Sequence, residues 1–152
     1  MKVVAITGGI GVGKTTVCDF FKSFGIPVYH SDVTAKQLMV ADLVLKDAIE
    51  SLLGKEAYLN DGGLNKAYIS SQIFGDSIKR NALNELVHPA VNADFEKWLL
   101  SVSNKSNKPP YVVYESALVF ENHKEAAFDA LILVTAPVED RIKRVVKRDS
   151  KT

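Results

Sequence analysis

The sequence predicts a three-layer α/β fold, in which a parallel β-sheet carries helices on both faces. Residues 3–7 form an apolar run without polar alternation, which is typical of a strand buried on both sides. An amphipathic helical pattern follows, and residues 26–30 form a second short apolar run. A strand, a helix and a strand within about thirty residues form a parallel crossover, the first unit of such a sheet.

The loop between the first strand and the first helix has the pattern of a phosphate-binding loop. Gly8 and Gly13 are separated by four residues, and Lys14 and Thr15 follow at once. Glycine permits the positive φ angles that turn backbone amides toward an anion. We expect Lys14 to reach the β- and γ-phosphates of a nucleotide and the Thr15 hydroxyl to bind Mg²⁺. A plain glycine-rich turn would leave the Lys-Thr pair unexplained.

Composition points to one soluble globular protein without a macromolecular anion as partner. The chain is 47% hydrophobic and 24% charged with a net charge of +1, so no overall field favours nucleic acid or an anionic membrane. No apolar run approaches the roughly 20 residues of a membrane span, and the N-terminus has no signal-peptide pattern. The single cysteine, Cys18, suits a cytoplasmic protein and is expected near the core rather than as a catalytic thiol.

Two helices have apolar stripes that we expect to be buried. The first helix, about residues 13–24, has its stripe at Val17, Phe20, Phe21 and Phe24 and ends at Gly25. The last helix starts near residue 135, and its stripe is Val138, Ile142, Val145 and Val146. Two more strands are expected at residues 111–114 and 130–134.

Two acidic residues come at the ends of predicted strands. The carboxyl ends of parallel strands form the ligand crevice, so Asp32 and Glu115 should face the same cleft as the phosphate loop. Asp32 can be a catalytic carboxylate, or Ser31 or Asp32 can cap the next helix, and these two roles are compatible. For Glu115 we favour a carboxylate of the metal and its waters over an exposed strand end.

Residues 42–103 form a helical block between the second and third strands. Within it, the long pattern from Ser77 to Val102 is interrupted by His88-Pro89, which predicts two helices or one kinked helix. The expected organisation is a nucleotide-binding core, residues 1–41 and 104–152, with residues 42–103 as an acceptor-binding insertion.

The last helix also has a basic stripe, formed by Arg141, Arg144 and Arg148. Such a stripe is usually a solvated face. Beside a phosphate loop, arginines that clamp a transferring phosphoryl group are the better explanation.

Several motifs in one order resemble the dephospho-CoA kinase family over essentially the whole chain. They are the loop Thr7–Thr16, Val28–Asp32, Leu64-Asn65-Lys66 with Ile73-Phe74, His88-Pro89, Leu118–Glu121 and the helix Arg141–Asp149. The resemblance implies a P-loop NTPase fold and transfer of the γ-phosphoryl of ATP to the ribose 3′-hydroxyl of dephospho-CoA, the last step of coenzyme A synthesis.

Together with the patterns described above, the resemblance implies roles for particular residues. The ATP-binding set is Gly8, Gly9, Gly11, Val12, Gly13, Lys14, Thr15 and Thr16. The catalytic set is Lys14, Asp32, Arg144 and Arg148, and the metal set is Thr15 and Glu115. The acceptor-binding set is Asp32, Asn65, Lys66, His88, Pro89, Glu115 and Leu118.

The chain also departs from the pattern of this family. His30 stands where the family often has an acid, and Lys66 stands where an arginine is usual. Family members continue past Asp149 to complete the lid and add a fifth strand and a helix, so a chain of this length could bind nucleotide with little turnover. A P-loop kinase for another small acceptor is the other alternative, and the pattern leaves the oligomeric state open.

Overall fold

The computed structural model describes residues 1–150 and divides the chain into two compact units. The first unit contains Met1–Asp32 and the chain from Leu99 onward, and the second unit is Val33–Trp98. Both α2 (Ser31–Ala41) and α5 (Ser77–Ser103) continue from one unit into the other. The predicted boundaries were residues 41 and 104, whereas the division falls inside these two helices.

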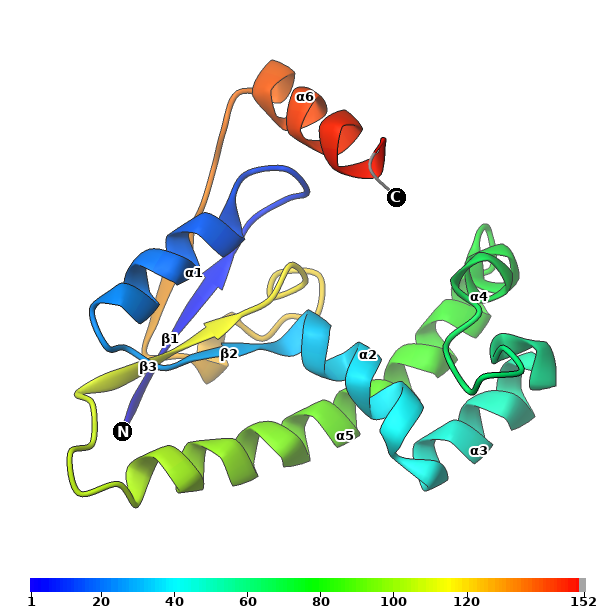
Figure 1. Cartoon of the computed structure of the whole chain (residues 1–152), viewed down its shortest axis with the longest axis horizontal. Helices are drawn as coiled ribbons and strands as arrows, with labels where there is room; N and C mark the ends of the chain where they lie inside the picture. Colours follow the sequence, from blue (N-terminus) through cyan, green and yellow to red (C-terminus); the bar gives the residue numbers. More distant parts are fainter. Residues whose placement is uncertain (151–152) are drawn as a thin grey trace. The chain divides into compact units, whose positions relative to one another are not determined.

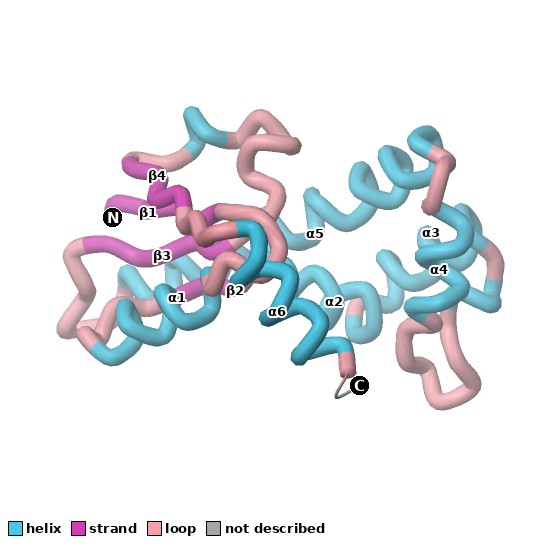
Figure 2. The backbone as a smooth tube through the Cα atoms, turned by 90° about the horizontal axis from the view of Figure 1, so that it is seen from above, coloured by secondary structure: helices cyan, strands magenta, loops and turns pink. Residues whose placement is uncertain are grey.

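The first unit is built on a four-stranded parallel sheet with the order β2-β3-β1-β4 (Figures 1 and 2). Its strands are β1 (Lys2–Thr7), β2 (Val28–His30), β3 (Tyr111–Glu115) and β4 (Ala130–Leu133). The central strands β1 and β3 are paired from Lys2 opposite Tyr111 to Ile6 opposite Glu115. The parallel α/β fold predicted from the sequence is confirmed.

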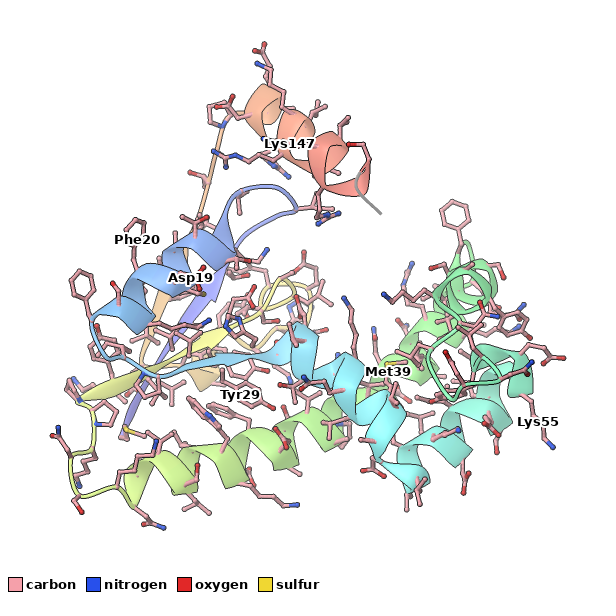
Figure 3. The ribbon with its side chains drawn as sticks, viewed as in Figure 1. Asp19, Phe20, Tyr29, Met39, Lys55 and Lys147 are labelled. Carbon is pink, nitrogen blue, oxygen red and sulfur yellow. The ribbon has the colours of Figure 1, made fainter. Side chains whose placement is uncertain are left out.

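Helix α1 (Lys14–Ser23) covers one face of this sheet through Cys18, which packs with Ile6 and Val113 in a fully buried cluster. The expected position of Cys18 is therefore confirmed. The expected burial of Phe20 and Phe24 is wrong, because their side chains are 61% and 79% exposed, and Phe20 points away from α1 in Figure 3. The apolar spacing defines a broad stripe, and the sheet contacts only its Val17, Cys18 and Phe21 side.

Helix α6 (Val138–Asp149) also differs from the expectation. Val138, Ile142 and Val146 are each more than half exposed, so the predicted burial of this stripe is wrong. The helix instead places two arginines against the phosphate loop. Arg141 and Arg144 donate to backbone carbonyl oxygens of the loop. The apolar stripe borders a cavity of about 280 Å³ next to Ile10.

The second unit is helical, as predicted. It contains most of α2, then α3 (Leu43–Leu53), the 3₁₀ turn η1 (Lys55–Ala57), α4 (Lys66–Ile73) and most of α5. Leu45, Ile49 and Leu53 of α3 are buried together with Ala57 and Ile69. The pattern around Pro89 predicted two helices or one kinked helix, and the structure has one continuous helix, α5.

The chain between β3 and β4 is irregular except for the 3₁₀ turn η2 (Glu125–Ala127). It returns to the sheet through β4, which pairs with β1. None of the helices within residues 1–150 is long and apolar enough to cross a membrane.

Candidate active site

The glycine-rich loop joins β1 to α1 with the backbone geometry that the sequence predicts. Gly8, Gly11 and Gly13 have φ angles of 148°, 76° and 99°, all positive. Gly13 is the N-cap of α1 and supplies no side-chain cap. The amides of the first turn are therefore available to an anion, which the helix dipole also favours.

Lys14 is the first residue of α1, and its ammonium group folds back over the loop. Its Nζ donates to the carbonyl oxygen of Gly8 at 2.8 Å and to that of Gly9 at 3.3 Å. Thr15 and Thr16 follow with exposed side chains, whereas Val12 is buried beneath the loop. The positive charge of Lys14 is thus held against two backbone carbonyl groups of the loop.

Helix α6 approaches the loop so closely that only glycine fits at position 11. A Cβ atom added to Gly11 would lie 2.7 Å from the carbonyl oxygen of Arg141, well inside van der Waals contact. Arg141 Nε donates to Ile10 O at 3.0 Å, and Arg144 Nη1 donates to Gly11 O and Val12 O at 3.2 and 3.1 Å. The missing side chain of Gly11 is therefore what lets α6 contact the loop.

The loop, the strand ends and α6 surround one cavity of about 260 Å³. Six of its lining residues are polar or charged, and the sequence had named all six: Lys14, Thr15, Asp32, Glu115, Arg144 and Arg148. These residues come from four separate parts of the sequence. The structure therefore brings the predicted catalytic and metal residues together beside the phosphate loop.

Asp32 is the second residue of α2, immediately after β2. Its Oδ1 accepts from Ser31 Oγ and its Oδ2 accepts from the backbone N–H of Ala117, both at 3.4 Å. These are long contacts, so they hold the carboxylate weakly. Asp32 lies inside the helix and not at its N-cap position, which leaves the carboxylate to face the cavity.

Glu115 is the last residue of β3, and it is 7% exposed. Its Oε2 lies 3.0 Å from Nδ1 of His30, the last residue of β2. The carboxylate is therefore buried at the carboxyl edge of the sheet with a hydrogen-bond partner, and it also lines the cavity.

The remaining predicted residues are not part of this cavity. Asn65 caps α4 by accepting from Tyr68 N at 3.2 Å, and Lys66 is exposed next to it. His88 and Pro89 lie on α5, in the second unit with Asn65 and Lys66. Leu118 belongs to the first unit, where its N–H donates to Ser116 Oγ at 3.2 Å.

For two residues at the site, the sequence did not predict the contacts that the structure shows. Arg141 belongs to the predicted basic stripe, but only the structure shows that it contacts Ile10 and Gly9 of the loop. His30 was recognised as a departure, and its contact with Glu115 depends on strand pairing. The position of His30 at a strand end was the signal that could have found it.

A phosphate-binding loop on a parallel sheet, with a lysine, carboxylates and arginines around one cavity, defines a P-loop phosphotransferase. A sequence profile described as dephospho-CoA kinase matches residues 2–152. The chain belongs to the dephospho-CoA kinase family, whose members are transferases.

Individual relatives agree with this family. A dephospho-CoA kinase of Salinibacter ruber is 38% identical over 149 residues, covering 98% of this chain and 74% of the relative. A dephospho-CoA kinase of Chlorobium luteolum is 35% identical over 150 residues, covering 96% of this chain and 68% of the relative.

Solved structures agree with the fold. TT1252 from Thermus thermophilus has a TM-score of 0.83 at 30% identity, covering 98% of this chain and 73% of that one. Dephospho-CoA kinase from Campylobacter jejuni has a TM-score of 0.65 at 15% identity, covering 99% of this chain and 97% of that one. At this identity the likeness is one of fold alone.

Proposed function

We propose that this chain transfers the γ-phosphoryl group of ATP to the ribose 3′-hydroxyl of dephospho-CoA, giving coenzyme A and ADP in the last step of coenzyme A synthesis. Family membership supports the reaction. The observation that supports particular residues for this reaction is the cavity beside the phosphate loop, which is lined by Lys14, Asp32 and Arg144. We place the enzyme in the cytoplasm, in agreement with its single, buried cysteine.

In this mechanism the loop amides and Lys14 bind the ATP phosphates. Asp32 orients the 3′-hydroxyl and accepts its proton while the oxygen attacks phosphorus. The bond between the γ-phosphorus and the β–γ bridging oxygen breaks as the new O3′–phosphorus bond forms, and ADP leaves. Arg144 and Arg148 neutralise charge on the transferring group, and the ordering of both reactants supplies much of the rate.

The donor set around the cavity fits Mg²⁺, which prefers oxygen ligands. The Thr15 hydroxyl and the Glu115 carboxylate would hold it, directly or through water. Within residues 1–150 no three His, Cys, Asp or Glu side chains form a ready-made metal cluster, and none is needed where nucleotide phosphates complete the coordination. When bound, the ion would offset the negative charge of the nucleotide phosphates.

The second unit is proposed to bind the acceptor, with Asn65, Lys66, His88 and Pro89 as its contact residues. Lys66 is exposed and can pair with a phosphate of dephospho-CoA as a point charge. Asn65 has a helix-capping contact as well, so its substitution would also affect the stability of α4. Leu118 and Glu115 are the proposed acceptor contacts from the first unit.

The deciding experiment is ADP release from Mg-ATP with and without dephospho-CoA, with the product identified by mass. Acceptor-dependent ADP together with coenzyme A is the expected result. Transfer to a nucleoside monophosphate but not to dephospho-CoA would overturn the proposed acceptor. ATP binding without transfer to any acceptor would show a nucleotide-binding chain of little activity.

A further inference from the structure

His30 and Glu115 form a pair at the carboxyl edge of the sheet. They are register partners, each the last residue of its strand, in the parallel pairing of β2 with β3. Partners in a parallel ladder project their side chains from the same face. Their contact of 3.0 Å between Nδ1 and Oε2 follows from this register.

Burial makes this contact important for the carboxylate. The side chain of Glu115 is 10% exposed and that of His30 is 24% exposed. An ionised carboxylate only accepts hydrogen bonds, so a hydrogen bond to Glu115 in that form requires the hydrogen on Nδ1 of His30. A carboxylate so little exposed to water requires such a donor, because desolvation without one is costly.

The same carboxylate faces the phosphate cavity on its other side. Glu115 lines that cavity together with Lys14 and Thr15, the first two residues of α1. The contact with His30 engages Oε2, and Oε1 is the second acceptor atom of the carboxylate. One carboxylate oxygen is thus held by His30, in a side chain that also lines the cavity.

We propose that His30 is a positioning residue, which holds Glu115 in the orientation that binds the Mg²⁺ of the Mg-ATP complex. The inference rests on the metal role of Glu115 in the proposed function. Hydrogen-bonded partners of metal-binding carboxylates fix the ligand's rotamer before the ion arrives, and their loss typically lowers metal affinity by about 10- to 100-fold. A contact that only joined β2 to β3 would instead affect stability.

The test measures ATP binding by calorimetry in excess Mg²⁺ and again in EDTA, and compares the ratio of the two affinities. His30→Leu keeps the volume of the side chain but removes the donor, and it should lower this ratio by about 10-fold while leaving metal-free ATP binding within about twofold. His30→Asn keeps a donor near the Nδ1 position and should retain the wild-type ratio. An unchanged ratio in His30→Leu would overturn the proposal.

Glu115→Gln separates this inference from the proposed function. If Glu115→Gln lowers the ratio and His30→Leu does not, the positioning role alone is wrong. If neither substitution changes it, Glu115 does not serve the metal, and both assignments fail. If His30→Leu does not fold, His30→Gln replaces it. The amide nitrogen of the glutamine lies one bond beyond the Nδ1 position, so the same decrease in the affinity ratio is expected.

Discussion

Arg144 Nη1 lies 3.1 Å from the carbonyl oxygen of Val12, at the turn of the phosphate loop into α1. The same nitrogen donates to the carbonyl oxygen of Gly11 at 3.2 Å. A guanidinium group has five donors, so these two contacts leave others for phosphate oxygens in the cavity that Arg144 lines. One side chain therefore links α6 to the loop and brings positive charge to the proposed transfer site.

Replacing Arg144 by Ala should lower kcat for phosphoryl transfer by about 10²-fold, because one preorganised charge on the transferring group is lost. Lys143→Ala is the matched control, since Lys143 is the exposed neighbour on the same helix and does not line the cavity. Steady-state kinetics of both variants check the prediction. Similar rates in the two variants would show that Arg144 has no part in transfer.

Gly11→Ala should damage both folding and nucleotide binding. Gly11 and Gly25 have the same φ of 76°. A Cβ atom added to Gly11 would lie 2.7 Å from the carbonyl oxygen of Arg141, whereas a Cβ atom added to Gly25 would have no neighbour within 4 Å. Gly25→Ala therefore costs only the left-handed backbone conformation, about 1 kcal/mol. Urea unfolding and ATP calorimetry should show a larger loss of stability and at least about tenfold weaker binding for Gly11→Ala. Equal effects of the two substitutions would contradict the close packing of α6 on the loop.

Asp32→Asn should reduce turnover far more than ATP affinity. The carboxamide keeps the shape but cannot accept the proton of the acceptor hydroxyl, so kcat should fall by about 10²- to 10⁴-fold. Lys14→Ala, by contrast, should weaken ATP binding as well as turnover, because its ammonium group lies over the loop. Parallel calorimetry and kinetics separate the two roles. Loss of ATP binding in Asp32→Asn equal to its loss of turnover would assign Asp32 to the nucleotide or the metal.

Cys18 should make the protein less stable as the pH rises above 9. Burial, with a smaller effect of Glu115, raises the pKa of the Cys18 thiol from 9.0 to about 11. The unfolded chain then loses this proton first, so stability is unaffected below pH 9 and declines as the pH rises from 9 to 11. The total loss of folding free energy is about 3 kcal/mol. Urea unfolding at pH 8 and pH 10.5 should show a steeper decline for wild type than for Cys18→Ala, and parallel declines would contradict the prediction.

Local rules account for most of what the sequence predicted correctly. The glycine pattern needed positive φ angles at Gly8, Gly11 and Gly13, and the structure has them. Strand ends were recognisable from apolar runs that stop at Asp32 or Glu115, and the topology of a parallel sheet places such ends at one edge. Lys14, Thr15, Asp32 and Glu115 of the cavity could therefore be named in advance. Arg144 and Arg148 were named from the basic stripe of the last helix and from the family resemblance.

Long-range packing decided what the sequence predicted wrongly. The stripes of α1 and α6 were expected to be buried along their whole length, yet Phe20 and Ile142 are 61% and 57% exposed. Periodicity shows that a helix has an apolar side but not which part of it a neighbour covers. For α6, the contacts of Arg141 and Arg144 with the loop determine which side faces inward.

The sequence by itself determined the phosphate loop and the parallel α/β class, and it singled out Lys14, Asp32 and Glu115, because each depends on short-range backbone geometry or on a strand's end. Only the tertiary structure decided that Nδ1 of His30 would meet Glu115 and that Arg141 would reach Ile10. These pairs are separated by 85 and 131 positions. Strand register and helix placement set such contacts, and both arise from packing of the whole unit rather than from any local pattern.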